Sequence, residues 1–180
     1  MLFRLLRILT ISSTCIYLIA CTSTTPSVTQ TPLPSPIAIT TPMKTSEWET
    51  RLPDNRGAVK IIFTLPQQAV AEFQFLNGKS SKSNMAVARV LLSNKNCTSG
   101  HSTTISYKIN SSDYLLKYFE KEAPWNNTNT VILAWDINNQ LTITMNDETT
   151  SIEVAKQVNT LKIASYLTQI EIHKIEYLAQ

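Results

Sequence analysis

Glycine, histidine and cysteine are scarce in this chain, which contains 3 glycines, 2 histidines and 3 cysteines among its 180 residues. The histidines, His101 and His173, are widely separated, and no serine-hydrolase elbow (GxSxG), zinc-protease motif (HExxH) or phosphate-binding glycine loop occurs. No motif in the sequence argues for an enzyme, and we predict no catalytic residues, no metal ligands and no cofactor site. We predict that the protein is not an enzyme.

An excess of charge of one sign is also absent. Removing Arg4, Arg7 and Lys44, which lie outside the predicted domain, from the 16 basic residues leaves 13, against 13 acidic residues. The remaining basic residues are scattered from Arg51 to Lys174. Because binding to phosphates requires clustered lysine and arginine, we predict no nucleic-acid partner.

No hydrophobic run is long enough to cross a bilayer. The stretch from Ile8 to Ala20 is apolar but diluted by serine and threonine, and it is shorter than the ~20 residues that a spanning helix needs. Arg4 and Arg7 precede it, which is typical of a secretion signal. The run Leu18-Ile19-Ala20-Cys21 that ends it resembles the lipobox of bacterial lipoproteins.

The lipobox resemblance implies a location and an anchor. It implies that residues 1–20 are a signal peptide removed before Cys21, and that Cys21 carries a diacylglyceryl group and further acyl chains such as palmitate, which hold the protein on a lipid bilayer. The residue after Cys21 is Thr22 rather than aspartate, which in the family pattern implies the outer membrane of the cell envelope. An ordinary secretion signal with a chance cysteine and a short membrane anchor remain the alternatives.

Residues 21–45 are predicted to form a linker. Between Thr22 and Thr45 the chain has 11 Ser/Thr and 5 Pro and no aromatic residue, so it cannot bury enough apolar surface to fold. In an extended polyproline conformation at ~3.1 Å per residue, it would hold a domain up to roughly 75 Å from the membrane. We interpret it as a spacer rather than as a proline-rich recognition motif.

Cys97 is the one cysteine left in the folded part, because Cys15 leaves with the signal and Cys21 carries lipid. A single thiol excludes an intramolecular disulfide, so Cys97 is buried, paired between chains or reactive. Its spacing to His101 is close enough for a shared site, but a structural zinc needs four protein ligands. We therefore interpret both as ordinary loop residues.

Residues 46–180 are predicted to form one all-β domain. Short β-branched or aromatic runs alternate with turn-forming sequence, at a spacing typical of an antiparallel β-sandwich. Glycine is replaced by asparagine in several predicted turns, such as Asn138-Asn139 in the hairpin from Thr130 to Asn146. The expected strands are Val59–Phe63, Ala69–Leu76, Met85–Leu92, Thr103–Ile109, Tyr114–Phe119, Thr130–Trp135 and Leu141–Met145.

The C-terminal part of the sequence allows two interpretations. Ile170, Ile172, Ile175 and Tyr177 fit a strand with one irregularity. A helix would instead be supported by spacings of three and four among Ile163, Leu167, Ile170, Lys174 and Tyr177. The density of isoleucine favours the strand. Residues 151–159 are predicted to form a short helix or a loop before it.

Two segments resemble concanavalin-like and laminin-G-like jelly rolls. The segment 134–146, with Trp135 and the Asn138-Asn139 turn, is similar to their tryptophan-bearing hairpin, and the segment 170–175 is similar to their last core strand. The usual glycine of the hairpin turn is absent, and no calcium-site motif is present. The resemblance implies a jelly-roll-like sandwich.

Trp125, Asn126 and Asn127 form the candidate ligand-binding site. An indole face stacks on the CH groups of a sugar, and neighbouring amides donate and accept hydrogen bonds, so a tryptophan in a polar loop is a workable carbohydrate-binding element. The alternative is that Trp125 packs under one end of the sandwich as a plug. Trp135 is predicted to lie in the core, whereas Trp48 is either a core residue or an anchor at the end of the linker.

Three functions are weighed. The first is a non-catalytic, lipid-anchored envelope protein that binds a glycan or an envelope polymer. The second is an accessory or pilot lipoprotein whose sheet edge pairs with an envelope protein. The third is a hydrolase, which would need two convergent carboxylates; Glu120 and Glu122 flank Lys121 in a pattern that indicates a solvated loop instead.

Overall fold

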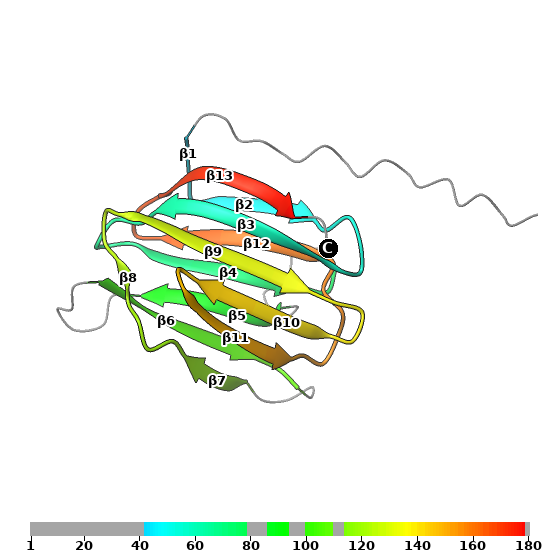
Figure 1. Cartoon of the computed structure of the whole chain (residues 1–180). Coiled ribbons are helices and arrows are strands. Elements are labelled where there is room, and N and C mark those ends of the chain that lie inside the picture. The colour runs from blue at the N-terminus through cyan, green and yellow to red at the C-terminus, as the bar shows by residue number, and fades with distance from the viewer. Residues whose placement is uncertain (1–41, 79–85, 94–99, 110–113, 179–180) are drawn as a thin grey trace, which may run out of the picture. The chain divides into compact units, whose positions relative to one another are not determined.

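Two antiparallel sheets packed face to face form the domain (Figure 1). The structure is a computed structural model that describes residues 42–78, 86–93, 100–109 and 114–178. Sheet A has the strand order β1-β13-β3-β9-β10-β11, and sheet B has the order β2-β12-β4-β5-β6-β7, with β8 paired to β6. The strands are β1 (Met43–Thr45), β2 (Glu47–Arg51), β3 (Gly57–Thr64), β4 (Val70–Leu76), β5 (Ala86–Ser93), β6 (Gly100–Tyr107), β7 (Leu115–Tyr118), β8 (Ala123–Pro124), β9 (Thr128–Trp135), β10 (Gln140–Met145), β11 (Glu148–Glu153), β12 (Thr160–Tyr166) and β13 (Ile170–Leu178).

The core lies between the inner faces of the two sheets. Alternate residues of each strand point inward, so apolar side chains such as Phe63, Phe73 and Leu133 are fully buried. The rings of Phe63 on sheet A and Phe73 on sheet B pack against each other with centroids 5.3 Å apart. Trp135 is 2% exposed, as predicted. The predicted all-β sandwich is confirmed.

Asparagine occupies the left-handed backbone positions that glycine usually takes. Asn139 (φ 61°) lies in the β9–β10 hairpin, Asn146 (φ 53°) in the β10–β11 hairpin and Asn126 (φ 53°) after β8. Asparagine tolerates this conformation better than most residues with a side chain. This confirms the prediction that asparagine replaces glycine in the turns of this chain.

The C-terminal segment is a strand, as the isoleucine density favours. It forms β13, and its register shifts between Ile172 and Lys174, which is the irregularity expected from the sequence. The interpretation of residues 151–159 as a helix or loop was wrong for its first part, because 151–153 complete β11. Serine and threonine make up half of this edge strand and Ile152 is its one apolar residue, so the sequence carries no apolar alternation that would indicate a strand.

The first strand of sheet A begins before the predicted domain boundary. β1 pairs with β13, with Met43 opposite Ile172, although residues 43–45 were assigned to the linker. The chain then turns at Ser46 and continues as β2 in sheet B, where Trp48 is half-buried and packs against the core. Trp48 therefore takes part in the core.

The two sheets are also tied together along one side of the sandwich. Lys117 on β7 donates from Nζ to the Ser151 carbonyl on β11 at 3.4 Å. The Glu148 carboxylate accepts hydrogen bonds of 3.0 Å from the backbone N–H groups of Glu120 and Lys121. These N–H donors lower the pKa of Glu148.

No helix in the described part of the chain is long and apolar enough to cross a membrane.

The two ends of the sandwich carry different turns. The first end carries the turns at 65–69, 123–127 and 166–169, and the opposite end carries the turns at 52–56, 136–139 and 154–159.

Candidate functional site: the outer face of sheet B

The outer face of sheet B combines polar and aromatic side chains. On each strand these residues alternate with buried ones; Glu72 and Gln74, for example, flank the fully buried Phe73 on β4. We call the following residues the sheet B face: Glu72, Gln74, Arg89, Leu91, Thr104, Ser106, Leu116, Tyr118, Lys162 and Tyr166.

Strand register sets the neighbours on this face. One row runs from Gln74 to Arg89, Ser106 and Leu116, each directly opposite the next on the adjacent strand. Residues directly opposite each other in antiparallel strands have Cβ atoms ~4.5–5.5 Å apart. An amide, a guanidinium and a hydroxyl group thus follow one another across three strands.

The second row places an aromatic ring beside the polar groups. It runs from Glu72 to Leu91, Thr104 and Tyr118. Tyr118 is 59% exposed, and Leu116 beside it in the first row is 58% exposed. Large exposed apolar side chains that adjoin a polar row form a surface on which a ring-shaped ligand can stack.

Tyr166 marks the other side of the face, on β12. Its hydroxyl donates to Glu72 Oε2 at 3.5 Å, and Gln74 Nε2 donates to the same oxygen at 2.5 Å. Partial burial, followed by the negative charge of Glu72, raises the pKa of Tyr166. Tyr166 is therefore a protonated hydrogen-bond donor with a ring that is 48% exposed.

Charges on the sheet B face are nearly balanced. Lys162 forms an ion pair with Glu47 on the neighbouring strand β2. The Arg89 guanidinium lies 5.5 Å from the centre of the Tyr114 ring, and Lys108 Nζ lies 4.5 Å from the same ring. Such cation–π contacts orient a cation without neutralising it.

The size of the face suits an elongated ligand. From β12 to β7 there are four gaps between strands, each of ~4.8 Å, which gives a width of about 19 Å between Tyr166 and Tyr118. Amide, carboxylate, guanidinium and hydroxyl groups in this span can each exchange hydrogen bonds with ligand hydroxyls. The arrangement therefore fits a flat, hydroxyl-rich molecule of several rings.

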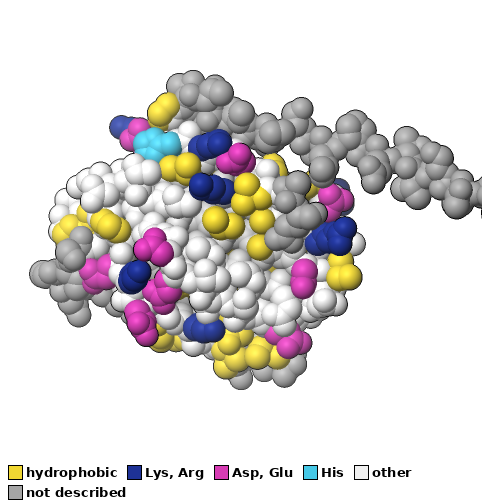
Figure 2. Space-filling model, viewed as in Figure 1, with side chains coloured by type: hydrophobic (Ala, Val, Ile, Leu, Met, Phe, Trp, Pro, Cys, Tyr) yellow, Lys and Arg dark blue, Asp and Glu magenta, His cyan; other side chains and the backbone are white. Residues whose placement is uncertain are grey.

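Sheet A presents a different outer face. Its hydroxyl groups pair with each other, because Thr142 bonds to Ser151 and Thr144 bonds to Thr149, each at 2.9 Å. Figure 2 shows this side of the molecule, where the area over β10 and β11 carries few hydrophobic side chains. None of the aromatic residues more than 36% exposed in the described chain lies on sheet A.

The predicted site at Trp125, Asn126 and Asn127 forms the turn after β8. Asn126 and Asn127 are exposed, and the Asn126 N–H donates to the Leu65 carbonyl at 3.1 Å. The Trp125 ring is half-buried and meets the His101 ring edge-on, with centroids 6.3 Å apart. Its Nε1 is buried without a hydrogen-bond partner. The ring is thus packed on one side, and the three residues lie at the first end of the sandwich, away from the middle of the sheet B face.

His101 is not a loop residue, which corrects the sequence interpretation. It lies in β6, is 0% exposed and its Nε2 is 2.9 Å from the Ala69 carbonyl oxygen. Burial lowers the pKa of His101, so the ring is neutral at physiological pH. Cys97 and Cys21 lie outside the described residues. No group of three or more His, Cys, Asp or Glu that could hold a metal occurs in the described ranges.

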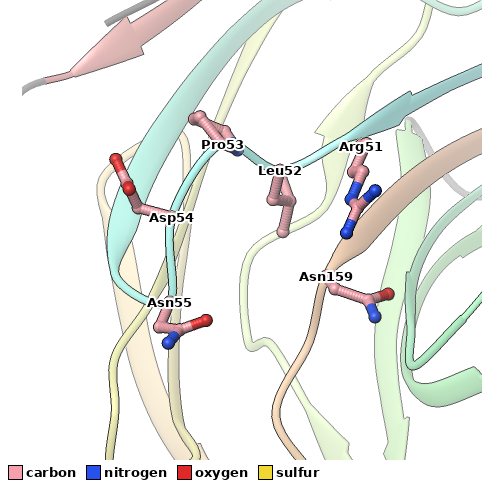
Figure 3. A pocket seen from close by; sticks show the side chains of 6 residues that line it. All are labelled: Arg51, Leu52, Pro53, Asp54, Asn55 and Asn159. Carbon is pink, nitrogen blue, oxygen red and sulfur yellow. The ribbon is translucent and has the colours of Figure 1, made fainter. Parts of the chain in front are cut away.

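A hollow of about 320 Å³ lies at the opposite end of the sandwich (Figure 3). Its lining residues are Arg51, Leu52, Pro53, Asp54, Asn55 and Asn159. Asp54 supplies the one carboxylate, which points away from Arg51 and Asn159 in Figure 3. The hollow therefore lacks the pair of converging carboxylates that glycoside hydrolysis requires.

Sequence reasoning did not identify the sheet B face. Glu72 and Gln74 alternate with buried phenylalanines and Arg89 with valine and alanine, so the outward positions of each strand were readable. Which strands lie side by side was not readable, since β4 pairs with β12, more than 80 residues away in the sequence. The signal that was available is Leu115–Tyr118, an apolar run whose four residues are all exposed.

Comparisons with known proteins identify the fold. No protein-family model and no curated protein matches the sequence. Among solved structures, an alginate lyase from Pseudomonas aeruginosa (TM-score 0.54, 10% identity, 69% of this chain and 65% of that chain) and one from Klebsiella pneumoniae (0.51, 10%, 69% and 60%) are similar. A tetrameric galectin from the ball sponge Cinachyrella matches with a TM-score of 0.54 at 10% identity, over 73% of this chain and 99% of that chain.

These likenesses concern the fold alone. The chain spans less than two thirds of the length of the two alginate lyases, whereas it covers nearly the whole galectin. The strand order of both sheets and these neighbours agree with the jelly-roll sandwich that the resemblance to concanavalin-like proteins implied. The domain is a jelly-roll β-sandwich.

Proposed function

We propose that this protein is a non-catalytic lipoprotein of the cell envelope that binds a glycan on the sheet B face. The observation that carries the proposal is the row Gln74, Arg89 and Ser106 beside the exposed Leu116 and Tyr118. Hydroxyl-bonding groups next to an apolar, partly aromatic surface match the two kinds of surface that a sugar ring presents, its hydroxyl edge and its CH face.

The similar structures support a carbohydrate ligand. Their names, alginate lyase and galectin, refer to proteins that act on or bind carbohydrate. The near balance of charge on the sheet B face favours a neutral glycan, because Glu72 and Arg89 are both present and Lys162 is paired with Glu47. A polyanionic chain would find no excess of positive charge on this face, because Glu72 offsets Arg89 and Glu47 offsets Lys162.

A binding protein fits the chemistry of this face better than an enzyme. Glu72 already accepts hydrogen bonds from Gln74 and Tyr166, and the raised pKa of Tyr166 makes it a poor general base. The proposal therefore gives these three residues a part in holding a ligand rather than in proton transfer.

The anchor is the second part of the proposal. The Leu18-Ile19-Ala20-Cys21 lipobox supports acylation of Cys21, and Thr22 supports residence in the outer membrane. The Ser/Thr/Pro-rich residues 21–45 would let the domain sample glycans at a distance from the bilayer. Mass spectrometry of the protein from membranes tests it: an N-terminal acylated Cys21 is expected, and an unmodified chain starting elsewhere would refute it.

A protein partner is the second candidate function. β7 is an edge strand of sheet B and all four of its residues are exposed, including Leu115 at 44% and Leu116 at 58%. Exposed edge strands of this kind can pair with a strand of another protein. An accessory lipoprotein would use this edge to hold an envelope protein.

An array of neutral and acidic glycans and peptidoglycan fragments distinguishes these functions. We expect a saturable neutral-glycan hit that is lost in Gln74→Ala/Tyr118→Ala and kept in the matched variant Thr142→Ala/Thr144→Ala on sheet A. Loss of the hit in Trp125→Ala alone would move the site to the 125–127 turn. The absence of any hit would refute glycan binding and leave the β7 edge as the site to study.

A further inference from the structure

The turn between β12 and β13 exposes a leucine in an unfavourable backbone conformation. Leu167 has φ 71° and is 86% exposed, the highest exposure among the large hydrophobic residues of the described chain. A bulky residue in the left-handed region is an outlier, whereas asparagine or glycine would fit without strain. Among the described residues other than glycine, asparagine occupies the other left-handed positions, at 126, 139 and 146.

The surrounding structure holds this turn in place. Ser165 Oγ donates to the Thr168 carbonyl at 2.6 Å, and the Ser165 N–H donates to the Ser46 carbonyl at 2.8 Å. Tyr166, which precedes the leucine, is 48% exposed. A braced turn therefore presents the large apolar side chain of Leu167 to solvent, although the backbone conformation at this position would favour a different residue.

The turn lies beside the point where the N-terminal segment joins the domain. Thr45 pairs with Ile170, only three residues after Leu167, and Ser46 bonds to Ser165. Figure 1 shows β1 above the ends of β12 and β13, at the same end of the sandwich. The described chain begins at residue 42, at the edge of sheet A, and β1 runs from there toward the end of the sandwich that carries Leu167.

We infer that Leu167 forms a membrane-contacting tip, which inserts into the headgroup region of the bilayer to which Cys21 anchors the chain. This inference rests on the proposed lipid anchor. A leucine side chain that is exposed to this extent can bury apolar surface at the interface between water and hydrocarbon. Because the proposed linker confines the domain to within roughly 75 Å of the bilayer, the tip can reach the surface and a weak contact is enough to orient the domain.

The tip would determine which surfaces are available to ligands. With the first end on the bilayer, the β strands stand upright and the sheet B face runs perpendicular to the membrane. The hollow near Arg51 and Asn159 points outward. The domain would then present its glycan-binding face sideways to polymers that run parallel to the membrane.

Fluorescence on vesicles tests the tip. The full chain, acylated in the host and reconstituted in phosphatidylethanolamine–phosphatidylglycerol vesicles, receives an environment-sensitive fluorescent amino acid in place of Gln169 or, as a matched control, of Asn138. Both positions are exposed turn residues, at opposite ends of the sandwich. We expect a blue shift and an increase in emission of about twofold at 169 and no change at 138.

The variant Leu167→Asn separates membrane contact from folding. It relieves the left-handed strain, so the melting temperature should stay the same or rise, while the fluorescence change at 169 is lost. Equal responses at 169 and 138, or an unchanged response in Leu167→Asn, would overturn the inference.

If Cys21 is not acylated, flotation and mass spectrometry give a different result. A chain without lipid would not float with the vesicles and would lack the acyl mass on Cys21. In that case the same chain coupled through Cys21 to a maleimide lipid, in a Cys97→Ser background, repeats the comparison of 169 with 138. The tip is then refuted or supported separately from the proposed anchor.

Discussion

The outer faces of the two sheets differ although their inner faces are alike. Both inner faces are lined by fully buried apolar side chains, such as Phe63 on sheet A and Phe73 on sheet B. On the outer face of sheet A, Thr142 and Thr144 bond to hydroxyl groups of the adjacent strand. The outer face of sheet B instead has mixed groups beside an exposed tyrosine. One sandwich can therefore carry an outer face whose hydroxyl groups bond to each other and a second outer face whose groups are suited to a ligand.

The largest effect on stability is expected from Phe73, which packs between the inner faces of the two sheets. Phe73→Ala removes a fully buried ring that packs on Phe63, and it should lower the free energy of unfolding by about 3–5 kcal/mol. The neighbouring outward residue provides the control, because Gln74→Ala should change it by less than about 1 kcal/mol. Thermal and chemical denaturation measure both. Similar losses in the two variants would show that the inner and outer faces have been assigned incorrectly.

A smaller effect, on the affinity for a glycan, is expected to differ between the two outer faces. Gln74→Ala/Tyr118→Ala removes one hydrogen-bonding group and one ring, which should weaken binding of a glycan by about 2–3 kcal/mol, or roughly 30- to 150-fold. Thr142→Ala/Thr144→Ala should leave it within about twofold. Isothermal titration calorimetry gives both values. A larger loss in the sheet A variant would reverse the comparison.

Lowering the pH should reduce the stability of the domain, because His101 is buried in β6 of sheet B. Burial lowers the pKa of His101 below the 6.5 of an unperturbed histidine, so the folded state binds this proton less readily than the unfolded state. Its contribution to stability is complete above pH 6.5 and is lost as the pH falls from 6.5 through the folded pKa. Melting temperatures between pH 7.5 and about 5 should therefore decline, and His101→Gln should flatten that decline. An equally steep decline in the variant would assign it to other groups.

The smallest effect should come from the hydroxyl pairs of sheet A. Replacing both partners in Thr144→Val/Thr149→Val removes a hydrogen bond without leaving an unpaired group. We expect a change in the free energy of unfolding within about 0.5 kcal/mol and no change in glycan affinity. A clear loss of affinity would show that sheet A contributes to the site.

The fold was largely readable from the sequence, because alternation and turn residues are local signals. Phe73 and Phe75 alternate with polar residues on β4, and Asn138-Asn139 marks the β9–β10 turn. The strands β2, β8 and β12 were not predicted. The short strand β1 and the serine- and threonine-rich β11 were also missed, because neither carries an apolar alternation. Both are edge strands of sheet A, held mainly by the backbone of the neighbouring strand.

The candidate site was less readable, because it depends on contacts between distant segments. Trp125 drew attention as a tryptophan in a polar loop, yet its environment is set by His101 on another strand. Gln74 and Arg89 gave no signal alone and become neighbours only through the register of β4 and β5. Leu167 was unremarkable in the sequence, since its left-handed conformation is imposed by the bonds of Ser165.

Chemical-shift mapping of the glycan found on the array tests the central claim most directly. Amide and side-chain resonances of the isotope-labelled protein are followed during titration with that glycan. The account predicts the largest shifts at Gln74, Arg89 and Tyr118, with Thr142 and Thr144 unchanged. Shifts centred on Thr142 and Thr144, or on Trp125 with Gln74 and Tyr118 unchanged, would contradict it.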